Sequence, residues 1–165
     1  MALKNYFELL NQPQTFAVDS LSLENAYQTL MARFHPDRFV NAPIVEKRVA
    51  EQVSVRINEA YQTVKTPLAR AQYLCSLKGM NVHERRPMPP AVLVKQMDWH
   101  EMLEAALATG DDGRLYDLKE EVTAERQQLL TQLQDAFDVK KDDALALELT
   151  RELMFVEKLL FTIQR

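Results

Sequence analysis

An all-α protein is the fold class that this sequence predicts, and three observations support the prediction. Only 3 of the 165 residues are glycine, and the alternation of apolar and polar residues that is typical of β-strands is hard to find. Apolar residues instead recur at intervals of three and four, which is the spacing of one helix face. Because 47% of the residues are hydrophobic, the chain can bury a core without disulfides or metal ions.

Two helices are predicted before the first long connection. The first covers residues 5–10, and the second can be capped by Asp19 or Ser20, whose side-chain oxygens can accept hydrogen bonds from backbone N–H groups. The apolar positions of the second helix share one face: Leu23, Tyr27, Leu30 and Phe34. This helix ends at His35, because Pro36 disfavours helical backbone in the residue before it.

A third and a fourth helix follow this connection. The third covers residues 44–65, with a period near 3.6 in its apolar positions: Val49, Val53, Ile57, Ala60 or Tyr61, and Val64. The period and the length of this run exclude a strand, despite its many valines. The fourth helix has Thr66 as its N-cap and Pro67 as its first residue. It ends near Lys78, with Gly79 suited to the C-terminal position.

Apolar residues lose their helical spacing in residues 79–90, where prolines and ionisable side chains indicate a linker. Helical stretches follow over residues 91–108 and 114–137, and a last helix, capped by Asp142 or Asp143, runs to the C-terminus. Short connections between long amphipathic helices predict an antiparallel three-helix bundle. The predicted domains are residues 1–78, the linker 79–90, and residues 91–165.

Composition excludes several classes of protein. The net charge of −4 argues against a general binder of nucleic acid or of anionic membranes, and no apolar run approaches the ~20 residues that cross a bilayer. The single Cys75 cannot form an internal disulfide and is expected to be a small buried hydrophobe. Together with His83 and His100 it shows no ligand spacing, so no metal or cofactor is expected. A cytoplasmic protein that is not an enzyme is predicted, since signal-peptide and catalytic motifs were not found.

The tripeptide His35-Pro36-Asp37 is the most informative motif of the chain. It lies between the second and third predicted helices, so it would present an imidazole and a carboxylate at the tip of a helical hairpin. Taken alone, the tripeptide is an ordinary helix stop in which Asp37 caps a helix or forms a turn. The flanking segments decide between the two interpretations.

Four segments in order resemble a J-domain, the module by which co-chaperones stimulate ATP hydrolysis on DnaK-type chaperones. They are NYFELL at 5–10, HPDRF at 35–39, INEAY at 57–61 and TPLARA at 66–71. The segment AQYLCSLKG at 71–79, the proline-rich linker and the short helical domain resemble the HscB type, which serves iron–sulfur cluster assembly. The Gly/Phe-rich stretch and the zinc-binding cysteines of other J-proteins are absent, as the HscB type implies. The N-terminal cysteine cluster that eukaryotic members of the family often carry is absent too, so the resemblance is to the bacterial form.

The resemblance implies contact with an HscA-like DnaK-type chaperone. The residues implied in this contact are His35, Pro36, Asp37, Arg33, Arg38 and Asn58. The tripeptide would trigger hydrolysis, and Asn58 would hold the loop by hydrogen bonding. The helix before the loop offers only Arg33 as a basic residue, although Lys47 and Arg48 extend the positive patch. Weak, salt-sensitive binding is therefore expected, and each basic residue alone is equally compatible with a solvated surface.

The resemblance also implies that the bundle holds the iron–sulfur scaffold protein. The implied residues are Leu93, Val94, Met97, Asp98, Glu101 and Phe155. Helical spacing allows most of those on the first bundle helix to share one face. A further carboxylate of the family is replaced here by Ala105. The apolar members are also compatible with the bundle core, where Trp99 and Leu103 compete with them for the inward positions and Val156 and Leu159 compete with Phe155.

The expected function is that of an adaptor. The chain would bind the scaffold protein, deliver it to the chaperone and stimulate the ATPase, and simultaneous binding would raise the effective concentration of the two partners. Two alternatives remain open from the sequence. The first alternative is a J-protein for another client, and the second is a structural helical protein whose tripeptide is a chance turn.

Overall fold

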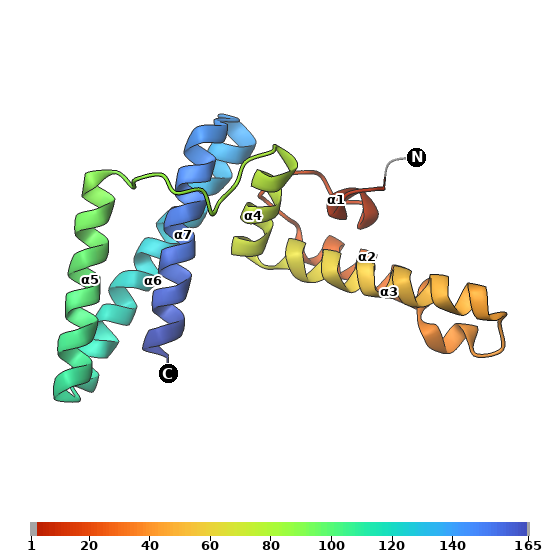
Figure 1. The fold of residues 1–165 in the computed structure, drawn as a ribbon, viewed down its shortest axis with the longest axis horizontal. Coiled ribbons are helices and arrows are strands. Elements are labelled where there is room, and N and C mark those ends of the chain that lie inside the picture. The colour runs from red at the N-terminus through yellow and green to blue at the C-terminus, as the bar shows by residue number, and fades with distance from the viewer. Residues whose placement is uncertain (1–2, 165) are drawn as a thin grey trace. The chain divides into compact units, whose positions relative to one another are not determined.

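The computed structural model describes residues 3–164, and all regular elements in this part of the chain are helices (Figure 1). The all-α prediction is confirmed. The helices are α1 (Tyr6–Leu9), α2 (Ser20–Phe34), η1 (Pro36–Phe39), α3 (Ile44–Lys65), α4 (Pro67–Leu77), α5 (Pro90–Thr109), α6 (Asp112–Gln134), η2 (Asp135–Val139) and α7 (Asp143–Ile163). The chain forms two compact units, and the boundary between them lies inside α4, between Leu74 and Cys75.

Polar side chains cap the helices where the sequence offers two candidates. The carboxylate of Asp19 accepts hydrogen bonds from the N–H groups of Leu21 and Ser22, so Asp19 is the cap of α2 and Ser20 its first residue. Likewise Asp142 caps α7 by accepting from the N–H of Leu145 at 3.1 Å. These oxygens satisfy backbone donors that have no partner within the helix.

The N-terminal unit is built on the antiparallel pair α2 and α3, with α1 packed against α3 (Figure 1). The ring of Tyr27 stacks on that of Tyr61 with 4.0 Å between centroids, and the Tyr61 hydroxyl donates to Glu24. Tyr73 of α4 accepts a hydrogen bond from the N–H of Tyr6 at 2.9 Å. Aromatic contacts and hydrogen bonds thus join α2 to α3, and a hydrogen bond joins α1 to α4.

One of the apolar positions that define the predicted period of α3 lies on the surface. Val49 is 52% exposed, whereas Ala50 and Ser54 are buried. The core stripe therefore runs through residues 50, 54 and 57, which are also spaced by four and three. The apolar period alone does not show which stripe faces the core, because two stripes with the same period overlap here and the valines make the exposed one more apolar.

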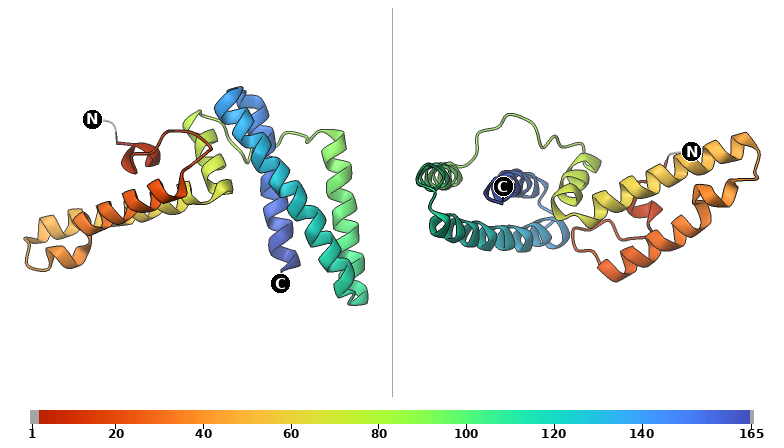
Figure 2. Two further views of the ribbon diagram at one scale, coloured as in Figure 1. Left: turned by 180° about the vertical axis from the view of Figure 1, so that it is seen from behind. Right: turned by 90° about the horizontal axis from the view of Figure 1, so that it is seen from below.

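In the C-terminal unit, α6 packs against both α5 and α7, as the right-hand view of Figure 2 shows. The core side chains come from all three helices: Trp99, Leu103, Leu118, Val122, Leu129, Leu133, Ala146, Leu153, Val156 and Leu159. The backbones of α5 and α7 approach each other less closely than either approaches α6. This arrangement leaves room for a depression between α5 and α7.

The buried thiol of Cys75 contributes to this packing. Its Sγ lies 3.7 Å from the hydroxyl of Thr150, which itself donates to the carbonyl of Ala146 at 2.7 Å. Burial raises the pKa of the Cys75 thiol above its ordinary value. The interpretation of Cys75 as a small buried side chain is confirmed.

Glu152 on α7 is a half-buried carboxylate, and it leads to a prediction about stability. Burial raises the pKa of Glu152 above the ordinary value of 4.5, and the nearby Glu148 and Glu125 raise it further. The folded state therefore holds the proton more tightly than the unfolded state, so ionisation at neutral pH lowers stability. We expect Glu152→Gln to raise the free energy of unfolding at pH 7 by about 0.5 kcal/mol, a value discounted for partial exposure.

The pH dependence of this gain checks its cause. Urea unfolding should show the gain at neutral pH and its loss as the pH falls below 4.5, where the carboxyl is protonated in both states. Glu120→Gln, at an exposed position of α6, serves as the matched control and should change stability less. Equal or lower stability of Glu152→Gln at neutral pH would contradict the prediction.

Candidate functional site

The loop after α2 is a short, self-capped turn. The N–H of His35 still donates to the carbonyl of Met31 at 2.8 Å, but the backbone of His35 is extended (φ −60°, ψ 134°), as Pro36 requires. The Nδ1 atom of His35 accepts a hydrogen bond from the N–H of Asp37 at 3.2 Å and so caps η1. An accepting Nδ1 places the ring proton on Nε2. The Nε2–H group is then the donor that the ring offers to a partner.

Two hydrogen bonds hold the end of α2 beside the loop. The guanidinium of Arg38 donates to the carbonyl of Ala32 at 2.6 Å, and the hydroxyl of Ser54 donates to the carbonyl of Phe34 at 2.8 Å. Both bonds satisfy carbonyl groups in the last turn of α2, where partners within the helix run out. Ser54 and Arg38 therefore fix the point from which the loop departs.

Asn58 does not form the expected hydrogen bond to the loop. Its side-chain oxygen accepts from the hydroxyl of Tyr27 at 2.6 Å, which joins α3 to the middle of α2. Ser54 is the α3 residue that bonds the backbone beside the loop, and sequence analysis missed it. A serine on the core stripe of a helix, between Ala50 and Ile57, was the available signal, since a buried hydroxyl needs a partner.

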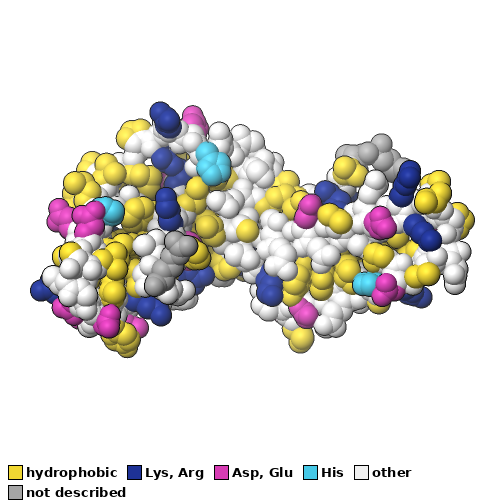
Figure 3. Space-filling model, turned by 60° about the horizontal axis from the view of Figure 1, so that its bottom comes forward, with side chains coloured by type: hydrophobic (Ala, Val, Ile, Leu, Met, Phe, Trp, Pro, Cys, Tyr) yellow, Lys and Arg dark blue, Asp and Glu magenta, His cyan; other side chains and the backbone are white. Residues whose placement is uncertain are grey.

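The charged groups around the loop are mostly open to solvent. The side chain of Asp37 is 89% exposed and that of His35 about half exposed. Arg33 is exposed, with its guanidinium 5.4 Å from the ring centre of Phe34. Figure 3 shows basic and hydrophobic side chains together at the hairpin end of the molecule. A protein partner thus has access to the tripeptide and to basic side chains near it.

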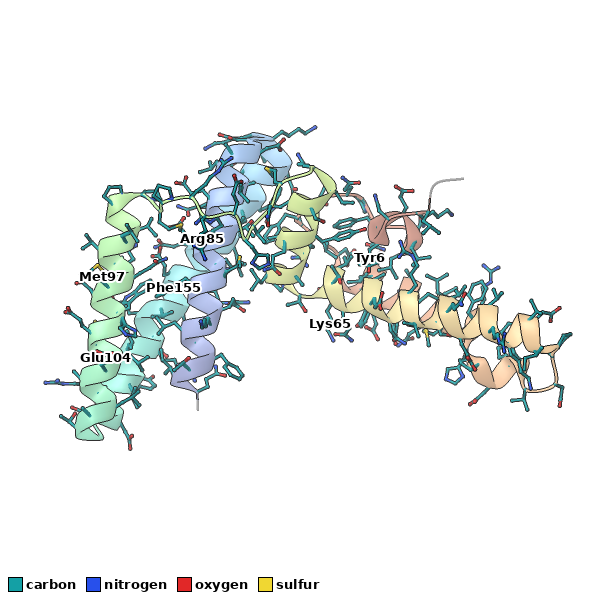
Figure 4. All side chains as sticks on the ribbon, in the orientation of Figure 1. Tyr6, Lys65, Arg85, Met97, Glu104 and Phe155 are labelled. Atoms are coloured by element: carbon teal, nitrogen blue, oxygen red, sulfur yellow. The ribbon has the colours of Figure 1, made fainter. Side chains whose placement is uncertain are left out.

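The second candidate surface is a depression of about 460 Å³ between α5 and α7. Of the predicted scaffold-binding residues, Leu93, Met97, Glu101 and Phe155 line it. Figure 4 shows Met97 and Glu104 on α5 and Phe155 on the neighbouring α7. We name this depression, with its lining residues, the α5–α7 groove.

Burial decides between the two interpretations of the α5 residues. Trp99 is only 3% exposed and Leu103 is also buried, so these two occupy the inward positions. Met97 is 62% exposed and Leu93 is exposed too. Because Trp99 and Leu103 lie on the opposite side of α5 from Met97, only one stripe can face the core. Leu93 and Met97 are therefore surface residues of the groove. Phe155 on α7 is partly buried, whereas its rivals Val156 and Leu159 are buried.

Two predicted residues lie outside the groove. Val94 is exposed but does not line it, and Asp98 lines a second depression of about 610 Å³ between α5 and α6. Glu101 lines both depressions. Arg114 and Asp117 of α6 also line this second depression. Ala105, the position at which the family has a carboxylate, faces this depression rather than the groove.

Three polar residues of the α5–α7 groove were missed by sequence analysis: Gln96, His100 and Glu104. The Nε2 atom of His100 lies 3.0 Å from a carboxylate oxygen of Glu104, one helix turn away. Glu104 follows Met97 by seven residues and Glu101 by three, so helical spacing alone placed all three on one face. The groove lining thus combines three apolar side chains with two carboxylates.

Two further kinds of site are absent from the described part of the chain. Within residues 3–164, no three His, Cys, Asp or Glu side chains converge so that they could hold a metal ion. None of the helices in the same part of the chain combines the length and apolar character needed to span a bilayer.

Known proteins resemble this chain over most of its length. Residues 88–164 match the family model described as the HSCB C-terminal oligomerisation domain. A co-chaperone protein HscB homolog of Aromatoleum aromaticum is 38% identical over 158 residues, which cover 94% of this chain and 89% of that protein. The chain belongs to the HscB family of co-chaperones. The expectation from the sequence motifs is confirmed at this level.

Solved HscB structures share the fold. Chaperone HscB from Vibrio cholerae superposes with a TM-score of 0.84 and 36% identity, covering 98% of this chain and 96% of that one. The human co-chaperone HscB superposes with a TM-score of 0.92 and 27% identity, covering 99% and 82%. An HscB fold comprises a J-domain followed by a helical bundle, so the predicted architecture is confirmed as well.

Proposed function

We propose that this HscB-family chain binds an iron–sulfur scaffold protein and delivers it to a dedicated DnaK-type chaperone in the cytoplasm, whose ATPase it stimulates. Membership of the family supports a co-chaperone role in iron–sulfur cluster assembly. In the proposal, residues 1–78 form the J-domain that contacts the chaperone, and residues 91–165 form the domain that binds the scaffold. Each domain carries its own exposed candidate surface.

The loop of the J-domain supports the first contact. His35 caps η1 through Nδ1 and keeps the Nε2–H group for a partner, while Asp37 is almost fully exposed. The imidazole then acts in polar recognition and loop geometry rather than in acid–base chemistry, since the hydrolysed ATP lies on the chaperone. Its side chain would contact the chaperone directly.

The observation that carries the proposal is the exposure of Leu93 and Met97 in a groove that Phe155 closes from the other helix. A cluster of apolar side chains with a charged rim is the usual composition of a protein-binding surface. Glu101 and Glu104 at the rim favour a partner segment that carries apolar and basic side chains. Such a segment on the scaffold protein is the proposed occupant.

A steady-state ATPase assay tests the proposal. We expect the chain to stimulate the DnaK-type chaperone modestly when added alone. Adding scaffold protein should raise the rate by more than the sum of the separate effects, because the adaptor holds both partners at high effective concentration.

The outcomes of this assay separate the alternatives. Stimulation without synergy would leave a J-protein that serves another client. Failure to stimulate the chaperone, with or without scaffold, would contradict the co-chaperone proposal. A variant that lacks scaffold binding but retains the loop supplies the matched control, since it should stimulate modestly and show no synergy.

A further inference from the structure

The hairpin tip of the J-domain exposes four large apolar side chains within ten residues. They are Val40, Ile44, Val45 and Val49, here named the tip patch. Val45 is 69% exposed, and Val49 on the next helix turn is 52% exposed. The patch follows the His35-Pro36-Asp37 loop directly in the chain, and η1 packs against α3, which carries most of it.

The fold itself does not explain these valines. Ala50 and Ser54 fill the inward positions of this part of α3, so Val45 and Val49 contribute little to the core. Valine is also a weaker helix former than the Lys, Arg, Glu or Gln typical of exposed helix positions. Contiguous exposed apolar side chains instead mark surfaces that bind partners.

We propose that the tip patch is an apolar extension of the chaperone contact and docks on an acidic surface of the DnaK-type ATPase that also exposes apolar side chains. This inference rests on the proposed function and adds a second kind of contact to it. The loop would supply polar recognition, and the tip patch would supply apolar burial beside it. The two are neighbours on one end of the hairpin.

Charge identifies the occupant. Between residues 33 and 49 the basic side chains are Arg33, Arg38, Lys47 and Arg48, and the acidic ones are Asp37 and Glu46. The tip is therefore positive on a chain whose net charge is −4. A second copy docking tip to tip would place like charges together, whereas an acidic protein surface would be attracted. A membrane fits less well, because the tip patch lacks the Trp and Phe side chains typical of interfacial anchors.

The tip patch has a consequence for the effect of salt. Salt screens exposed charges, with a Debye length of about 10 Å at 0.1 M, but it does not screen apolar burial. The purely basic contact expected from the sequence would lose its strength steeply as salt rises. With the tip patch included, part of the chaperone binding should persist at high salt.

Titration of chaperone ATPase stimulation with the full chain tests the inference. We compare the wild type, the double variant Val45→Ser/Val49→Ser and the control Val55→Ser, an equally exposed valine farther along α3. Serine and valine have similar helix propensities, so α3 should persist, and circular dichroism checks it. The half-maximal concentration should rise about tenfold in the double variant. It should change less than about twofold in the control, in line with a surface substitution away from any interface.

Each further outcome decides the inference. Equal titrations of wild type and double variant would overturn the tip patch and leave the proposed function standing. A wild type that fails to stimulate at all would overturn both. If the double variant loses binding to phosphatidylserine vesicles while its ATPase titration is unchanged, the patch is a membrane contact, and the inference is wrong. The wild type could also sediment as a dimer and the double variant as a monomer with unchanged stimulation. The occupant is then a second copy, and the inference is wrong.

Discussion

His35→Gln should lower stimulation of the chaperone ATPase by at least about tenfold, while the circular dichroism spectrum and scaffold binding stay normal. In the structure, Nδ1 of His35 accepts the N–H of Asp37 and thereby caps η1. Glutamine places its amide one bond farther from the backbone, where it matches Nε2 but not Nδ1. The substitution therefore removes the cap, and the polar contact with the chaperone loses its geometry. Steady-state ATPase rates at saturating co-chaperone measure the loss.

His35→Asn is the matched comparison. The shorter amide can accept the N–H of Asp37 in the manner of an N-cap, but it cannot reach a partner as Nε2 does. We expect His35→Asn to keep more stimulation than His35→Gln, because the turn stays formed. Equal loss in the two variants would show that the chaperone needs the ring itself. Undiminished stimulation by His35→Gln would contradict the role given to the loop.

Met97→Ala combined with Phe155→Ala should weaken scaffold binding by about 100-fold. These two side chains come from different helices and line the same groove, so together they form the centre of the candidate interface. Apolar and aromatic side chains at the centre of an interface commonly account for more than 1 kcal/mol each when truncated, and a total of about 2.8 kcal/mol corresponds to this 100-fold loss. Calorimetric titration of the scaffold protein into each variant measures the change.

The control for this experiment removes equally exposed apolar side chains elsewhere in the bundle. Leu107 on α5 and Tyr116 on α6 are both exposed and lie outside the groove. Leu107→Ala combined with Tyr116→Ala should leave scaffold affinity within about threefold, as expected for surface substitutions away from the site. Wild-type affinity of Met97→Ala/Phe155→Ala would place the scaffold contact elsewhere on the chain. Loss of basal chaperone stimulation in that variant would instead indicate damage beyond the bundle.

Local rules were sufficient to predict where helices begin and end. The predicted span of the third helix, residues 44–65, agrees with α3 at both ends. Pro43 lies before its first residue, and Thr66-Pro67 ends it, so the signals are encoded within a few residues. The prediction of residues 114–137 for the second bundle helix was less accurate. The regular α-helical part ends at Gln134, and the chain continues as the wider turn η2 with Phe137 buried.

Local rules were not sufficient to predict which face of a helix turns inward. On α5, Leu93 and Met97 formed one candidate stripe and Trp99 and Leu103 another, and each satisfies the helical period. Packing against α6 selected the second stripe and left Leu93 and Met97 in the groove. On α3, packing likewise turned Ala50 inward and left the neighbouring Val49 exposed.

The tripeptide His35-Pro36-Asp37 illustrates the difference between what local sequence rules predict and what helix packing decides. The sequence by itself determined that the helix stops there, since proline acts on the residue beside it through steric and hydrogen-bonding limits. Only the tertiary structure decided what holds the loop, because Ser54 lies 20 residues away and meets the carbonyl of Phe34 only after α2 and α3 have paired. Contacts between distant residues depend on how helices pack, and the periodicity of one helix does not contain that information.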